Sequence, residues 1–167
     1  EEAAMMEAYQ KAGTPGMAHA GLAATVGEYN VVIKSWSAPG APASESTGTA
    51  SRKLMLGGRV VSEELQSSMY GQPYTGFGLT GFDNVTGKYW TTWNDSMTTG
   101  LTVGEGECDA QARCAFTAHW DDPVSKKPVT ARIAIRWTSP SVEIFEMHGP
   151  GPDGKEMKMM EMTYTRK

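Results

Sequence analysis

The chain has 167 residues, which is enough for one domain with a buried core and hardly enough for two. Its 40% hydrophobic and 20% charged residues exclude an intrinsically disordered protein, and its 19 glycines and 9 prolines exclude a plain helical bundle. The net charge of −4 leaves no basic surplus for nucleic acid or an anionic membrane, and no apolar run approaches the ~18–20 residues of a transmembrane helix.

The N-terminal 25 residues favour helix. Short helices are expected over 3–12 and 17–25, separated by the Gly13-Thr14-Pro15-Gly16 breaker. The chain starts at Glu1 without a methionine, as after removal of a signal peptide or after trimming. The compartment stays open, with an exported, periplasmic protein slightly favoured over a cytoplasmic one.

Beyond Gly27 the chain alternates about ten short β-prone runs with turn clusters. Breakers such as Pro39-Gly40-Ala41-Pro42 and Gly57-Gly58 separate the runs. The expected strands cover 28–36, 46–56, 59–68, 74–82, 88–95, 100–107, 113–121, 128–138, 141–148 and 155–166.

The run 128–138 shows the clearest period of two. Its apolar residues, Val129, Ala131, Ile133, Ile135 and Trp137, fall on one face, as in a sheet with one buried face. Many sequential strands with short connections predict an all-β, antiparallel, up-and-down β-barrel of about ten strands, because closure removes exposed edges. The alternative is an open two-sheet sandwich. We expect a helical segment over 1–25 and a barrel domain over 26–167.

Cys108 and Cys114 flank a predicted hairpin turn. Cysteines in this arrangement can reach the separation that a disulfide requires, and a bridge would indicate an oxidising compartment. The alternative is two unrelated thiols at a turn. Two cysteines are too few for a structural zinc site.

Several segments occur in a characteristic order: Val26-Gly27-Glu28-Tyr29, Leu56-Gly57-Gly58-Arg59, Gly81-Phe82-Asp83-Asn84, Trp93-Asn94-Asp95-Ser96-Met97-Thr98-Thr99-Gly100, Gly151-Pro152-Asp153-Gly154-Lys155-Glu156, and Met160 to Lys167. This series resembles a family of small bacterial proteins, the domain of unknown function 1579 family, from about residue 20 to the end. The resemblance implies a lipocalin-like (calycin) β-barrel. It implies no established activity and no catalytic residues.

A closed barrel of this size can hold one small ligand, so we looked for inward-facing aromatic and polar residues. The tryptophans Trp36, Trp90, Trp93, Trp120 and Trp137 are candidates for the lining, or for ordinary packing. If Trp93 points inward, Asp95 does too, and its carboxylate would need a partner such as Arg59 or Arg166. Asp95 would then anchor a ligand head group; the alternatives are a fixed Asp–Arg pair or a cap on the following turn.

Tyr164 and Arg166 share a face of the last predicted strand. Fatty-acid-binding barrels hold a carboxylate with a similarly spaced pair in the opposite order, an analogy of fold alone. The alternative is a solvated Arg166 at a frayed end. The predicted ligand-binding residues are Arg59, Trp93, Asp95, Met97, Tyr164 and Arg166.

Signs of catalysis are weak. There is no nucleophile elbow, phosphate-binding loop or His-Glu-x-x-His motif. We therefore assign no catalytic residues, no metal and no cofactor; haem held by His119 or His148 is a minor alternative. The favoured hypothesis is a non-enzymatic barrel that binds a small hydrophobic or amphipathic ligand. The alternatives are a protein-interaction or homodimer module that uses the barrel exterior, and an enzyme that uses Asp95, Glu146, Glu161 or His148 inside the barrel.

Overall fold

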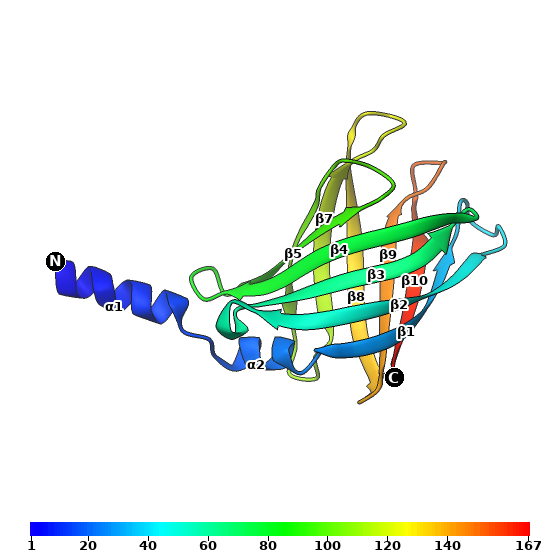
Figure 1. Ribbon diagram of the computed structural model, residues 1–167. Helices are drawn as coiled ribbons and strands as arrows, with labels where there is room; N and C mark the ends of the chain where they lie inside the picture. The colour runs from blue at the N-terminus through cyan, green and yellow to red at the C-terminus, as the bar shows by residue number, and fades with distance from the viewer.

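The computed structural model describes all residues from Glu1 to Lys167. Two helices precede ten strands along the chain (Figure 1). The helices are α1 (Glu2–Gly13) and α2 (Met17–Ala23), and a short 3-10 turn covers Leu56–Gly58. The strands are β1 (Gly27–Ser35), β2 (Ser44–Met55), β3 (Val60–Met69), β4 (Gln72–Asp83), β5 (Lys88–Asp95), β6 (Thr102–Cys108), β7 (Cys114–Asp121), β8 (Pro128–Ser139), β9 (Val142–Pro150) and β10 (Glu156–Arg166).

The ten strands form one closed antiparallel barrel. Each strand pairs with its neighbours in the chain, and β1 closes the ring by pairing with both β2 and β10. Tyr29 of β1, for example, stands opposite Ala50 on one side and Arg166 on the other. The predicted up-and-down barrel is therefore confirmed, and the two-sheet sandwich is wrong.

Because successive strands run in opposite directions, the barrel has two distinct ends. At one end, called here the helical end, α2 packs against β3 and β4, and the buried His19 donates from Nε2 to the carbonyl of Phe82 at 3.0 Å. The opposite end, called here the far end, carries the last residues of β1, β3 and β5, which are Ser35, Met69 and Asp95.

Helix α1 projects away from the barrel (Figure 1), and none of its residues is buried. Its last turn is attached by side chains of the barrel. The amide of Asn84 donates to the carbonyls of Lys11, Ala12 and Thr14, and Nε of Arg59 donates to the carbonyl of Gly13 at 2.9 Å. These donors satisfy carbonyls that the end of a helix leaves without partners.

The alternation predicted for the eighth run is found in the structure, and β2, β6 and β7 show it as well. Along β8, Ala131 and Ile133 are buried, while Arg132, Ala134 and Arg136 are exposed. Two buried clusters result inside the barrel. The larger groups Tyr29, Val31, Ile33, Ala50, Leu65, Tyr74, Met162 and Tyr164, and the smaller groups Phe116, Ala118 and Ile133.

The predicted run 46–56 differs from the structure at its end. Strand β2 stops at Met55, and Leu56, Gly57 and Gly58 have φ angles of 50°, 63° and 92°. A left-handed backbone cannot continue a strand, and glycine adopts it without steric cost. The Gly57-Gly58 bend turns the chain directly into β3.

A disulfide joins Cys108 and Cys114. The two residues stand opposite each other where β6 ends and β7 begins. The bridge thus closes the short turn 109–113 at the helical end of the barrel.

Candidate ligand-binding lumen

The inside of the barrel is not filled along its whole length. Inward positions along β5, from Tyr89 to Asp95, all stay partly exposed, as do Ile135 and Trp137 of β8 and Phe145 and Met147 of β9. The accessible surface of the chain is 10285 Å², against about 8,000 Å² for a typical folded monomer of this mass. The unpacked helix α1 and the accessible interior both contribute to the excess.

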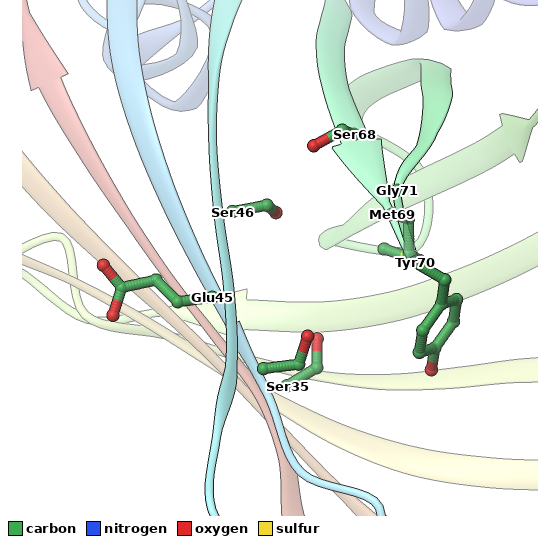
Figure 2. A pocket seen from close by; sticks show the side chains of 8 residues that line it. Ser35, Glu45, Ser46, Ser68, Met69, Tyr70 and Gly71 are labelled. Atoms are coloured by element: carbon green, nitrogen blue, oxygen red, sulfur yellow. The ribbon is translucent and has the colours of Figure 1, made fainter.

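A hollow of about 110 Å³ opens at the far end, between β2 and the β3–β4 turn (Figure 2). Backbone pairing of β2 with β3 covers only Thr49–Met55, and nearer the far end the two strands are joined by Oγ of Ser67, which donates to the carbonyl of Thr47 at 2.9 Å. Among the lining residues, Ser35, Ser46 and Met69 occupy inward positions. Ligand pockets usually measure ~300–1,000 Å³, so this hollow is too small to be a complete site; we interpret it as the mouth of the lumen because Ser35, Ser46 and Met69 face inward.

A buried ion cluster closes the lumen toward the helical end. Arg52 donates from Nε to Glu63 at 2.7 Å and from both terminal nitrogens to Glu143 at 2.7 and 3.1 Å. Its guanidinium lies 4.7 Å from the ring centre of Tyr29 and 4.6 Å from that of Tyr164. The Tyr164 hydroxyl donates to the second oxygen of Glu63 at 3.0 Å. We call these five residues the floor cluster.

Burial and neighbouring charges shift the pKa values of two groups of the floor cluster, Tyr164 and Arg52. Burial raises the pKa of Tyr164 well above its ordinary value, and the charge of Glu63 adds to this effect. Burial opposes the charge of Arg52, but the carboxylates of Glu143 and Glu63 raise its pKa well above the ordinary value. Each carboxylate oxygen of Glu63 and Glu143 accepts a bond from Arg52 or Tyr164, so both carboxylates have the guanidinium of Arg52 as a charged partner within the chain.

A second polar cluster lies nearer the far end and consists of Tyr74, Trp93 and Asp95; we call it the mouth cluster. The Tyr74 hydroxyl donates to Oδ2 of Asp95 at 2.8 Å, and Nε1 of Trp93 approaches the same oxygen at 3.2 Å. The backbone N–H of Met97 donates to Oδ1 of Asp95 at 3.0 Å. Burial raises the pKa of Tyr74, so its hydroxyl remains a donor. Trp93 and Asp95 stay partly exposed.

The structure therefore brings together two of the predicted ligand contacts, Trp93 and Asp95. The Asp–Arg pair suggested for Asp95 does not form, because Tyr74 and Trp93 provide its side-chain partners. Arg59 is exposed on the outside of the barrel and donates to the carbonyls of Gly13 and Leu56.

The remaining predicted contacts are separate from the mouth cluster or already bonded. Tyr164 belongs to the floor cluster, and Arg166 donates to the carbonyls of Ala24, Val26 and Pro140 at the helical end. The two side chains thus have separate partners within the chain, at Glu63 and at backbone carbonyls. Met97 lies in the turn after β5 with 53% of its surface exposed. A ligand role for any of these residues stays a prediction.

The residues proposed for catalysis are mostly on the outer surface. Glu146 and His148 occupy outward positions on β9. Glu146 pairs with Arg136 and Lys158, each at 3.4 Å, and Glu161 pairs with Lys158. Burial opposes the ionisation of Glu146, but the charges of Lys158 and Arg136 lower its pKa. Of the four residues proposed for an enzyme, only Asp95 faces the lumen.

The five tryptophans divide between the two faces of the wall. Trp93, Trp120 and Trp137 occupy inward positions and pack against the buried clusters. Trp36 lies 5.3 Å from the Lys158 ammonium, and Trp90 covers Gly81. Only the first three can line the lumen.

The exterior also carries exposed apolar residues. Phe77 on β4 and Val103 on β6 are 41% and 43% exposed, and Leu101 just before β6 is 51% exposed. Nothing within the chain covers them. The homodimer or interaction module therefore stays a prediction.

Two further features concern cofactors and membranes. The structure contains no group of three or more His, Cys, Asp or Glu side chains placed to share a metal ion. Neither helix combines the length and the apolar run that a membrane-crossing helix requires.

The sequence interpretation missed Arg52, Glu63, Glu143 and Tyr74. A signal for them existed, because each occupies an inward position in a strand of alternating burial. Glu63, for example, lies between the buried Val61 and Leu65. A charged residue at one of the alternate strand positions that face the core indicates an internal ion pair or a ligand site.

The family model for proteins of unknown function, DUF1579, matches residues 14–166. The chain belongs to this family. The resemblance deduced from the ordered segments is thus confirmed, and all of α1 lies outside the DUF1579 match. No curated protein matches the chain.

Two solved structures are similar to this DUF1579 chain. The S-type phycobiliprotein lyase CPES from Guillardia theta has a TM-score of 0.63 at 11% identity, covering 91% of this chain and 93% of its own. A redesigned beta barrel has a TM-score of 0.43 at 13% identity, covering 87% of this chain and 94% of its own. The likeness to the lyase shows a shared calycin-like fold and nothing of activity.

Proposed function

We propose that the barrel binds a small hydrophobic or amphipathic molecule in its lumen, as a binding protein and not as an enzyme. One observation carries this proposal: inward aromatic and methionine side chains stay partly exposed although the wall around them is closed. A folded protein normally fills such an interior to the density of an organic crystal. An apolar space that the chain leaves open is the usual setting of a ligand.

The distribution of polar groups supports the proposal. The accessible lining is mainly apolar and includes Trp137, Phe145, Met147 and Met160. A few fixed polar groups interrupt it at the mouth cluster, where Trp93 and Asp95 are held by hydrogen bonds. An apolar cavity with a small number of positioned polar groups is typical of small-molecule sites.

The proposal is tested with N-phenyl-1-naphthylamine, a neutral probe that fluoresces in apolar surroundings. We expect saturable binding at one site per chain and a raised melting temperature, since ligand at 100-fold excess over Kd stabilises by about 2.7 kcal/mol. Ile135→Trp places a tryptophan at an inward position of β8, whereas Ala134→Trp places the same side chain on its outer face.

We expect Ile135→Trp to weaken probe binding at least tenfold and Ala134→Trp to leave it unchanged. Circular dichroism and the melting temperature of each variant establish that the barrel is intact. Absence of saturable binding to the wild type would overturn the proposal. Equal effects of the two variants would place the probe on the surface and also overturn it.

A further inference from the structure

We propose that the lumen selects a ligand with a cationic nitrogen, an organic ammonium group, which lies on the open face of Trp93 beside the carboxylate of Asp95. This inference rests on the proposed function and adds the chemical class of the ligand. Its basis is the geometry of the mouth cluster and the distribution of charge inside the barrel.

The indole of Trp93 lies along the barrel wall, because two glycines of β4 leave room for it. A Cβ added at Gly76 would stand 2.0 Å from Cζ2 of Trp93, and one added at Gly78 would stand 2.7 Å from its Cε3. The six-membered ring therefore rests over both glycines. One face of the ring is covered by the wall, and Trp93 as a whole is partly exposed at an inward position, so part of its surface remains accessible from inside the barrel.

The carboxylate of Asp95 is oriented but not neutralised. Its three partners are the Tyr74 hydroxyl, the Trp93 indole N–H and the backbone N–H of Met97, all uncharged. It forms none of the ion pairs found within 4.0 Å in this chain. A carboxylate offers about four acceptor positions, so capacity remains on Asp95 for a further donor.

No cation pairs with Asp95: the two inward arginines are bonded elsewhere, and Arg166, whose partners are uncharged carbonyls, lies at the opposite, helical end of the barrel. Arg52 is bonded to both Glu63 and Glu143, which leaves the floor cluster with one more negative than positive charge. An anionic ligand would thus meet Asp95 without a counter-charge, whereas an ammonium would supply the missing one.

An aromatic face beside a carboxylate is the pair of groups that recognises organic cations. The electron-rich face of tryptophan attracts ammonium groups, and the attraction grows when the cation leaves water. The mouth at Ser35, Ser46 and Met69 lies at the same end of the barrel as Asp95. A cationic head group can therefore bind near the mouth while its apolar tail extends along the lumen.

The test compares three molecules with the same chain length: dodecylammonium, dodecanol and dodecanoate, each displacing N-phenyl-1-naphthylamine at neutral pH. We expect the wild type to bind dodecylammonium at least tenfold more tightly than dodecanoate, with dodecanol between them. Asp95→Asn removes this preference and leaves the affinity for dodecanol within about threefold. Asp121→Asn, which removes an exposed outward carboxylate at the same end of the barrel, keeps the preference.

The outcomes separate the two proposals. If the wild type binds dodecanoate as tightly as dodecylammonium, or if Asp95→Asn keeps the preference, the ammonium inference is wrong while lumen binding stands. If the probe itself fails to bind the wild type, both proposals fall. Dodecanol binding to Asp95→Asn shows that the lumen of this variant is intact. If Asp95→Asn does not fold, the comparison of the three molecules on the wild type decides the inference.

Discussion

The floor cluster and the mouth cluster use the same chemical groups with opposite results. Each contains carboxylate, tyrosine and a further aromatic ring facing the inside of the barrel. In the floor cluster, Arg52 offsets one of the two negative charges and the carboxylate oxygens are bonded within the chain. In the mouth cluster, Asp95 receives only neutral donors, and Trp93 stays partly exposed.

The difference shows which polar groups inside a barrel serve its stability and which are available to a ligand. A buried charge with all its partners inside the chain maintains the fold and costs much if one partner is removed. A charge that is positioned but not neutralised contributes less to the fold and can gain a partner from outside. The following variants separate these two roles.

The largest effect is expected from Arg52→Met. The change leaves Glu63 and Glu143 buried without their cation, and breaking a buried ion pair in this way costs about 3–5 kcal/mol. Urea denaturation followed by circular dichroism measures the loss in the free energy of unfolding.

Arg132→Met is the matched control, because Arg132 pairs with Glu156 on the exposed surface. Water screens the charges of an exposed ion pair, so this variant should lose far less stability than Arg52→Met. Similar losses from the two variants would contradict the distinct role given to the floor cluster.

A smaller effect is expected from Gly76→Ala. The added methyl group would overlap the ring of Trp93, which must then leave the wall and enter the lumen. Overpacking of this kind costs about 1–3 kcal/mol, and the displaced ring should also weaken binding of N-phenyl-1-naphthylamine. Denaturation and probe titration measure the two consequences.

Gly100→Ala is the control for Gly76→Ala, since a methyl group there meets only Oγ1 of Thr98 at 3.5 Å. The double variant Gly76→Ala with Trp93→Leu should lose less stability than the sum of the single changes, because the smaller side chain removes the overlap. Additive losses would show that Trp93 does not depend on the glycine for its position.

The sequence was sufficient for the features that depend on local patterns. The alternation from Val129 to Trp137 indicated one buried face, and the spacing of Trp93 and Asp95 placed both on one side of a strand. These inferences required no knowledge of which strands pair.

The features that depend on strand register could not be derived in the same way. Arg52 and Glu143 are 91 positions apart and meet only because β2 and β9 approach across two intervening strands. Gly78 stands opposite Trp93 through the register of β4 and β5, and Tyr74 reaches Asp95 through the same pairing. From the sequence, Asp95 was expected to need a partner, and an arginine was suggested. Which residue provides that partner depends on strand register, which the sequence does not show.

The smallest effect concerns alkaline pH and Tyr164→Phe. Burial raises the pKa values of Tyr29, Tyr74 and Tyr164, so the folded chain keeps protons that the unfolded chain releases above about pH 10. The stability from these raised pKa values is therefore complete below about pH 10 and falls as the pH rises further.

Tyr164→Phe should lower the steepness of that fall, by up to about 1.4 kcal/mol per pH unit, while the exposed Tyr9→Phe leaves it unchanged. Melting temperatures between neutral and alkaline pH, with phenolate absorbance as a second signal, measure the slopes. Equal slopes for the two variants would mean that Tyr164 ionises as readily in the folded barrel as in the unfolded chain, and the floor cluster would then lack the tight internal bonding that distinguishes it from the mouth cluster.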